Sequence, residues 1–327
     1  MKMTKLFSAL AMVPMLLLGG LLTGQVHAQA WPQKPLKLIV PSGPGSAPDV
    51  VARLMGEKLG RVLGQPVIVE NRVGGGGLIA VNQLRQSPPD GYTLSLMQAA
   101  VATTTPFLYK EATYDVVRDL DPITTIAVTP MLFVSNPEFP ARTLGEAIAA
   151  ARAAPGAVAL ASSSRGSIPN LAGELLGRRA GVQFQNIPYQ TSSQAVQAVV
   201  GNQVPLFVDG VGAMVQLVRS GKLRALAVAS ETVLPGLEGI PLAKDTVPGL
   251  NLYGWFAMIA PKGTPKDVVS RLNKEINDII KQPDVIEKFH SMGTYSRGST
   301  PEGAQQFIRN EVTLFGDVIK AAGLKQE

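Results

Sequence analysis

Short apolar runs alternate with amphipathic stretches along the first third of the chain. The run at 36–40 predicts a buried strand, and the apolar residues that follow Asp49 recur near the 3.6-residue period of a helix, which Gly64 and Pro66 end. The elements predicted here are strands at 36–40, 67–69 and 92–97, a helix starting at Asp49 and a helix at 78–86. This order predicts a mostly parallel sheet with helices on both faces.

The middle of the chain repeats this alternation. Thr143, followed three residues later by Glu146, is typical of a capping box, and Pro155-Gly156 ends the Ala-rich helix that it opens. A second helix is predicted through 171–176. The strands predicted here are 131–134, 157–161, 184–188, 205–208 and 223–229.

The last part of the chain is predicted to be mostly helical. Thr264-Pro265 predicts the N-cap and first residue of a helix that reaches about Ile280, and Thr300-Pro301 predicts the same start for the last helix. The apolar run at 255–259 is expected in the core. Since no long linker separates the two α/β regions, we expect the chain to cross between two lobes more than once, leaving a cleft where small ligands usually bind.

The first 28 residues have the pattern of a secretory signal peptide. Lys2 and Lys5 precede a mostly apolar stretch, and Val26-His27-Ala28 places small residues where a signal peptidase cleaves. A membrane anchor is the alternative, but Pro14 interrupts a stretch shorter than the roughly 20 residues that a spanning helix needs. We therefore predict cleavage after Ala28 and export to the periplasm.

Composition then removes several kinds of chemistry. The chain has 327 residues, no Cys, two His and a net charge of +6. The absence of Cys excludes disulfides, thiolate nucleophiles and cysteine-bound metals. No dense basic run predicts a nucleic-acid partner. With His27 in the signal segment, His290 is the only histidine expected in the mature chain, and its amphipathic surroundings predict a surface or packing role.

Two strand-to-helix loops are the best candidates for a binding site. The first loop (residues 41–49) has Ser42, Gly43, Gly45, Ser46, Ala47 and Asp49, and the second loop (residues 162–170) has Ser163, Ser164, Arg165, Gly166, Ser167 and Asn170. Glycines let a backbone approach a ligand, and the amides at a helix N-terminus favour an anion. The alternative is that both are ordinary turns, in which Ser46 or Asp49 caps the helix and Arg165 is solvated.

Three further features leave alternatives open. The glycines at 74–77 resemble a phosphate cradle but lack a following Lys-Ser/Thr, so a turn with positive backbone angles is the better interpretation. Asp209 ends a strand and either faces the cleft or caps the next helix. A secreted serine hydrolase would need a base, and only His290 is available; no G-x-S-x-G motif is present.

The mature chain resembles the Bug-type periplasmic solute-binding receptors of tripartite tricarboxylate transporters. The resemblance is carried, in order along the chain, by Trp31 to Pro41 with Pro44-Gly45 and Asp49, Val69 to Arg72 with Gly74 to Gly77, Pro89 to Leu94, Ala172 to Leu176, Ile187 to Tyr189, Gly221 to Val228 and Ala260 to Pro265. It implies an α/β, two-lobed, type II-like Venus flytrap, each lobe with a mixed, mostly parallel sheet flanked by helices. We expect residues 29–128 with 253–327 in one lobe and 129–252 in the other.

The resemblance also implies a site and a function. A small carboxylated or related polar solute would be held by the residues of the two loops and by Asp209, through amides, hydroxyls and water, with no metal or other cofactor. The expected partners are this solute and the membrane transporter subunits, and the receptor is expected to be a monomer and not an enzyme. A ligand sensor for a membrane signalling partner is the alternative to transport.

Four residues depart from the family pattern. Ser42 stands where an aromatic residue is usual and Ser46 where glycine is usual, while Ser164 and Asn170 replace the usual Gly and His. Loss of the aromatic predicts a roomier or more polar pocket. The extra hydroxyls and Arg165, which falls at a variable position, would favour an additional polar or anionic group on the ligand.

Overall fold

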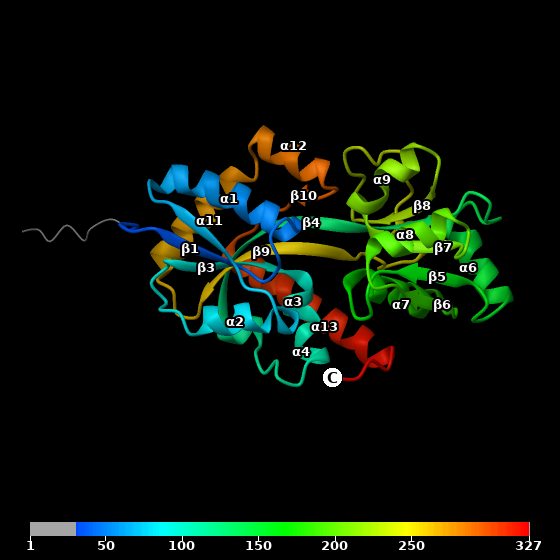
Figure 1. Cartoon of the computed structure of the whole chain (residues 1–327), viewed down its shortest axis with the longest axis horizontal. Coiled ribbons are helices and arrows are strands. Elements are labelled where there is room, and N and C mark those ends of the chain that lie inside the picture. Colours follow the sequence, from blue (N-terminus) through cyan, green and yellow to red (C-terminus); the bar gives the residue numbers. More distant parts are fainter. Residues whose placement is uncertain (1–30, 327) are drawn as a thin grey trace, which may run out of the picture.

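The computed structural model describes residues 31–326, so the predicted signal segment lies outside the described residues. Figure 1 shows two lobes side by side, joined by the long strands β4 (Leu120–Ser135) and β9 (Tyr253–Pro261). The class is α/β with helices flanking mixed sheets, as the sequence predicted.

The first lobe contains the N-terminal and C-terminal parts of the chain. Its own strands are β1 (Leu36–Val40), β2 (Val67–Asn71), β3 (Thr93–Gln98) and β10 (Tyr295–Ser296). Its helices are α1 (Ala47–Leu63), η1 (Gly75–Gly77), α2 (Leu78–Arg85), α3 (Ala99–Thr103), α4 (Thr105–Leu108), α5 (Val116–Asp119), α11 (Lys266–Ile279), α12 (Pro283–Ser291) and α13 (Pro301–Ala321).

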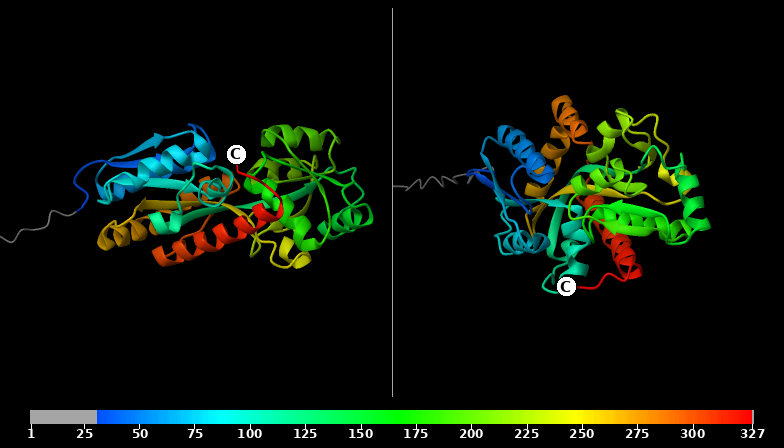
Figure 2. Two further views of the ribbon diagram at one scale, coloured as in Figure 1. Left: turned by 90° about the horizontal axis from the view of Figure 1, so that it is seen from below. Right: turned by 45° about the vertical axis from the view of Figure 1, so that its right-hand side comes forward.

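The second lobe is formed by the middle of the chain. Its strands are β5 (Ala159–Ser162), β6 (Gln185–Pro188), β7 (Leu206–Gly210) and β8 (Arg224–Ala229). Its helices are α6 (Leu144–Ala153), α7 (Ile168–Ala180), α8 (Ser192–Val200), α9 (Val211–Arg219) and α10 (Ala243–Thr246). The last helix of the chain, α13, runs from the first lobe towards the second (Figure 2) and contacts both β4 and α7.

The two lobes share one strand arrangement. β1 pairs in parallel with β2 and β3, and β5 pairs in parallel with β6 and β7. Every antiparallel pair of these sheets involves β4 or β9. β4 changes partners between Pro130, which faces Tyr253 of β9, and Met131, which faces Gly210 of β7 and Ala229 of β8. The junction between the lobes therefore lies within a continuous strand.

Helix starts follow the predicted capping chemistry at two of three positions. The Thr143 hydroxyl accepts the Glu146 N–H at 3.1 Å, and the Thr300 hydroxyl accepts the Gly303 N–H at 3.0 Å. The prediction for Thr264 is wrong: α11 begins at Lys266 with Pro265 as its N-cap. Thr264 is buried and donates its hydroxyl to the Pro261 carbonyl at 2.8 Å, so it closes the turn before the helix.

The first helix also starts earlier than predicted. α1 begins at Ala47, so Asp49 lies inside its first turn, and it ends at Gly64 as expected. The run at 255–259 belongs to β9 and is buried, with Trp255 only 1% exposed. Each candidate loop lies between a mostly buried strand and a helix with one buried face: β1 and α1 for the first loop, β5 and α7 for the second.

Candidate functional site

The first loop connects the carboxyl end of β1 to the N-terminus of α1. The Ser42 and Ser46 hydroxyl oxygens lie 2.9 Å apart, and Ser46 also donates to the Gly43 carbonyl at 2.7 Å. Ser46 is the N-cap residue of α1, as one interpretation of the sequence had it, but its hydroxyl makes no capping hydrogen bond to the helix. Gly45 has φ +78°, a left-handed conformation that favours glycine, and it turns the loop back onto the helix.

Asp49 fixes this loop from inside α1. Its Oδ2 accepts the Gly45 N–H at 2.9 Å, and its Oδ1 accepts the Asn71 side-chain amide at 2.8 Å. The Arg53 guanidinium lies 2.9 Å from Oδ1. Its hydrogen bond to Asp49, aided by the Gly45 and Asn71 donors, holds the pKa of Asp49 at about 2 against the cost of burial. Asp49 is therefore ionised at neutral pH although only 2% of it is exposed.

The second loop repeats this geometry at the carboxyl end of β5. The Ser163 and Ser167 hydroxyl oxygens lie 3.1 Å apart, close to the 2.9 Å between the equivalent oxygens of Ser42 and Ser46. The Gly166 N–H donates to Asn170 Oδ1 at 3.0 Å, and Asn170 Nδ2 donates to the Ser162 hydroxyl at 3.2 Å. Gly166 has φ +74°. The two loops are thus equivalent residue by residue at a constant offset along the chain.

The loops differ in how their helix N-termini are satisfied. The Ser167 hydroxyl accepts the Asn170 N–H of α7 at 3.3 Å, whereas the Ser46 hydroxyl makes no such bond to α1. The first amides of a helix have no partner within the helix. Among the described residues, the N–H groups of Ala47 and Asp49 at the start of α1 are therefore left for an acceptor from outside, and the helix dipole favours a negatively charged one.

Asp209 lies at the carboxyl end of β7, in the same lobe as the second loop. It is 8% exposed; its carboxylate accepts the Ser192 hydroxyl at 2.5 Å and the Gly210 N–H at 2.7 Å. Burial raises the pKa of Asp209, while those two donors oppose the shift. Its side chain is thus used to join β7 to α8, and it does not cap α9, whose N-cap is Gly210.

The other candidate residues of the two loops differ in exposure. Ala47, Ser164 and Arg165 are exposed, and Gly43 is partly exposed. The glycines at 74–77 all have positive φ, as predicted. His290 packs its ring 5.1 Å from that of Tyr295 and is partly buried, which agrees with the packing role.

Two close approaches join the lobes on either side of this region. A Cβ placed on Gly166 would lie 2.4 Å from Cδ1 of Leu108, so the second loop rests directly on α4. A Cβ on Gly212 at the start of α9 would lie 2.2 Å from the Met292 carbonyl oxygen, and a Cβ on Gly293 would lie 2.2 Å from the Gly212 nitrogen. The neighbours of Gly212 and Gly293 are backbone atoms, so the lobes touch backbone to backbone at α9, whereas Gly166 packs against the end of the Leu108 side chain.

Sequence reasoning missed the residues that act from outside the two loops. Arg53 and Asn71 hold Asp49, Ser192 holds Asp209, and Leu108 supports Gly166. Asn71 alone carried a usable signal, because it ends the strand that neighbours β1, on the edge where ligands bind in open α/β sheets.

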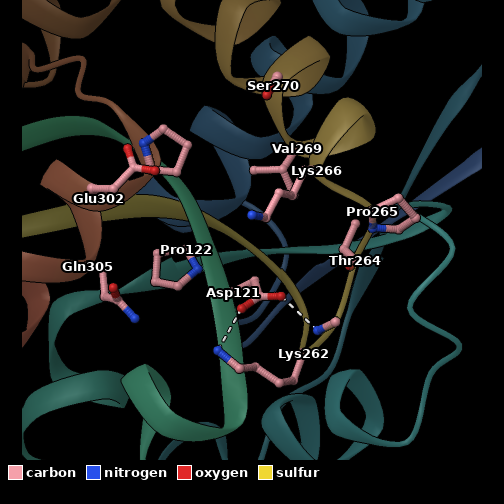
Figure 3. Close-up of a pocket in the computed structure, with 12 residues that line it drawn as sticks. Asp121, Pro122, Lys262, Thr264, Pro265, Lys266, Val269, Ser270, Glu302 and Gln305 are labelled. Carbon is pink, nitrogen blue, oxygen red and sulfur yellow. Dashed lines mark hydrogen bonds and ion pairs between the residues drawn. The ribbon is translucent and has the colours of Figure 1, made fainter.

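A cavity of about 610 Å³ lies elsewhere, at the opposite end of β4 from the lobe junction (Figure 3). Asp121 lines this cavity and bonds to two neighbouring lining residues: its Oδ1 lies 2.8 Å from Lys262 Nζ, and its Oδ2 accepts the Gly263 N–H at 2.7 Å. The starts of α11 and α13 supply the remaining walls, including Lys266 and Glu302. All of these residues belong to the first lobe, so this cavity does not lie between the lobes.

In residues 31–326, no three His, Asp or Glu side chains are grouped as metal ligands would be. No helix in that part of the chain combines the length and apolar character needed to cross a membrane.

Comparison with known proteins gives one consistent result. Residues 51–324 match the family model of the tripartite tricarboxylate transporter family receptor. The protein BugT of Bordetella pertussis is 34% identical over 327 residues, covering 99% of both chains. A protein of R. palustris solved with adipate is 29% identical with a TM-score of 0.75, and the periplasmic binding protein BugD is 31% identical with a TM-score of 0.70; each alignment covers 91% of this chain and all of the other.

Proposed function

The chain belongs to the tripartite tricarboxylate transporter receptor family, and from this premise we propose that it captures a small carboxylated solute between its lobes and delivers it to membrane transport subunits. Structural relatives are described as bound to adipate and to malate, the latter in MatC from Rhodopseudomonas palustris at 27% identity. The matching family is described as one of transporter receptors, which favours the receptor over the serine hydrolase.

The observation that carries the proposal is the pair of equivalent loops. Each loop ends a buried strand and begins a helix, and each is stiffened by a serine pair and by a side chain that accepts a glycine N–H. A rigid loop of this kind presents backbone amides and hydroxyls without reorganisation when a carboxylate arrives. No nucleophile or base is needed for this work.

We assign the ligand contacts to the exposed parts of both loops. Asp49 and Asn170 are buried and already bonded, so they position the loops, and Asp209 does the same for β7 and α8. The residues proposed for the site are Ser42, Gly43, Gly45, Ser46, Ala47 and Asp49 in the first loop, Ser163, Ser164, Arg165, Gly166, Ser167 and Asn170 in the second, and Asp209.

Closure would use the crossing strands as a hinge. We propose that residues 29–128 with 253–327 and residues 129–252 move as two bodies, because β4 exchanges its partners between Pro130 and Met131. A ligand that contacts both loops binds the closed arrangement better than the open one and shifts the population towards it. The mature receptor is proposed to be a periplasmic monomer released from the signal segment 1–28.

Calorimetry and thermal unfolding with adipate, malate and the neutral adipamide test the proposal. A binding carboxylate should add about 2.7 kcal/mol of stability at a concentration of 100 Kd, whereas adipamide should add much less. If neither acid changes the unfolding temperature of the folded protein, or if adipamide acts as adipate does, the carboxylate receptor is rejected for these solutes. Capture of a membrane transporter subunit only in the presence of ligand would support transport; capture of a membrane kinase would support the sensor.

A further inference from the structure

A small cavity lies where the second loop of one lobe meets the first lobe. It has a volume of about 90 Å³ and is lined by Leu108, Tyr109, Arg165, Leu324 and Lys325. Arg165 comes from the second lobe, while the other four come from the end of α4 and from the segment after α13. The cavity therefore exists only while these parts of the two lobes are together, as the contact of Gly166 with Leu108 shows them to be.

The C-terminal segment is held in place at this cavity. After α13, the Leu324 N–H donates to the Ile319 carbonyl at 3.2 Å, and the chain turns at Gly323, which has φ +64°. Leu324 packs against the core, and the Gln326 side-chain amide donates to the Pro106 carbonyl of α4 at 3.5 Å. Lys325 is thus presented by an ordered turn between two anchored neighbours.

The cavity also adjoins the two loops of the proposed site. A Cβ placed on Gly76 would lie 2.8 Å from the Tyr109 ring, and one on Gly77 would lie 3.3 Å from Cβ of Pro41, where the first loop begins. On its other side, Arg165 is itself part of the second loop. The cavity therefore borders the second loop directly and the first loop through the glycines at 74–77.

The charges at this cavity are of one sign. Arg165 and Lys325 line it, and none of its lining residues is acidic. Within residues 31–326, neither cationic group has a hydrogen bond or an ion pair. Two like charges that converge on a partly enclosed space raise its affinity for an anion. A volume of about 90 Å³ is about three times the share of one water molecule, which is room for a carboxylate or an oxyanion of similar size.

We propose that this cavity is an anion subsite at the lobe interface, in which Arg165 and Lys325 together hold one carboxylate or similar oxyanion. The proposal rests on the proposed function where that anion is the second carboxylate of a solute whose first carboxylate lies on the loops. A free inorganic oxyanion has the same chemistry and is the other source. In either case the anion bridges Arg165 of the second lobe to Lys325 of the first and stabilises the arrangement in which they approach.

Two variants and one control separate the subsite from the rest of the site. Arg165→Gln and Lys325→Gln each remove one charge at the cavity, while Lys320→Gln removes an exposed charge in the last turn of α13. Calorimetry with adipate and with hexanoate, which differ by one carboxylate, is compared across these proteins. We expect each cavity variant to reduce the preference for adipate over hexanoate by about tenfold, and Lys320→Gln to keep it. An unchanged preference in both cavity variants overturns the subsite while leaving the carboxylate receptor standing.

Sulfate tests the subsite without the proposed function. Thermal unfolding is measured in millimolar sulfate against chloride at equal ionic strength. If sulfate stabilises the wild type and Lys320→Gln more than Arg165→Gln and Lys325→Gln, a free oxyanion occupies the subsite. This result supports the subsite even if adipate and malate do not bind and the proposed function fails for these two acids. If sulfate stabilises all four proteins equally and the acids do not bind, the subsite is rejected as well. Circular dichroism establishes that each variant is folded.

Discussion

Asp49 and Asn170 occupy equivalent positions in the two lobes, each accepting the N–H of the glycine four residues before it, at 2.9 and 3.0 Å. The geometry is the same but the charge is not. Four residues further on, Arg53 pairs with Asp49, whereas the position that follows Asn170 in the same way holds Glu174. Each loop therefore has the acceptor that its own helix can support, a carboxylate beside arginine and a neutral amide beside glutamate.

Asp49→Asn should lower stability near neutral pH and flatten its dependence on acid. The Arg53 hydrogen bond holds the pKa of Asp49 at about 2, below its ordinary value of 3.8. A lowered carboxyl pKa stabilises the folded state above pH 4, and this contribution is lost as pH falls from 4 to 2. Urea unfolding at pH 7 should show a loss of about 2 kcal/mol in the variant. If the stability of the variant falls between pH 4 and pH 2 as steeply as that of the wild type, this account of Asp49 is contradicted.

Asn170→Asp is the mirror experiment and has the opposite sign. A carboxylate introduced at this buried position, 4% exposed, has no arginine partner and has Glu174 one turn away on the same helix. Burial would raise its pKa, so stability should fall as pH rises from 4 to 7, by about 1–3 kcal/mol at pH 7. If the difference in stability between the variant and the wild type is the same at pH 4 and at pH 7, the two loops are not electrostatically different.

Ala47→Pro tests the proposed role of the free amides of α1. Proline is favoured at the first position of a helix, and Ser46 already has the extended backbone, φ −71° and ψ 160°, that a residue before proline prefers. The variant should fold normally but lose one N–H, and the Kd for adipate should rise about tenfold. Ala47→Ser keeps the amide and is the control. If the two variants bind adipate alike, the Ala47 amide is not a ligand contact.

The sequence predicted what depends on local signals. The strand at 36–40 is found at those residues as β1, and both loops were located because turn residues follow a strand and open a helix. β4 was predicted only at 131–134, because Pro122 and Pro130 interrupt its earlier part, and proline argues against a central strand. The structure accommodates this segment with irregular register between Pro122 and Thr124.

The parts of the site that escaped prediction come from distant segments. The position of Asn71 at the end of the strand beside β1 indicated that it lies near the site, but not that its amide bonds to Asp49. The placement of Lys325 and Arg165 at one cavity depends on how α13 crosses to the second lobe. Such contacts are set by tertiary packing, which hydrophobic periodicity and turn residues do not describe. The loops were predictable, whereas their supports were not.

Glu311→Gln should remove a pH dependence that originates near the lobe junction. The Glu311 carboxylate accepts the Trp255 indole N–H at 3.1 Å and is 8% exposed; burial raises the pKa of Glu311 to about 7, while this bond and Arg297 oppose the shift. The ordinary pKa of a glutamate is 4.5, so the contribution of Glu311 to stability is fully present at pH 4 and is lost as pH rises through 7. The variant should match wild type at pH 4 and exceed it by up to about 3 kcal/mol at pH 8 in urea unfolding. Identical profiles would contradict the shift.

Gly212→Ala should force the lobes apart where α9 meets the turn after α12. Its Cβ would lie 2.2 Å from the Met292 carbonyl oxygen, a distance that only movement of the backbone can relieve. Gly239→Ala is the matched control, because a Cβ there meets nothing within 4 Å. We expect a larger radius of gyration by small-angle scattering for Gly212→Ala in the presence of adipate, and a Kd for adipate raised about tenfold, since closure then opposes binding. If Gly212→Ala and Gly239→Ala agree in both measurements, the contact between Gly212 and Gly293 does not limit closure.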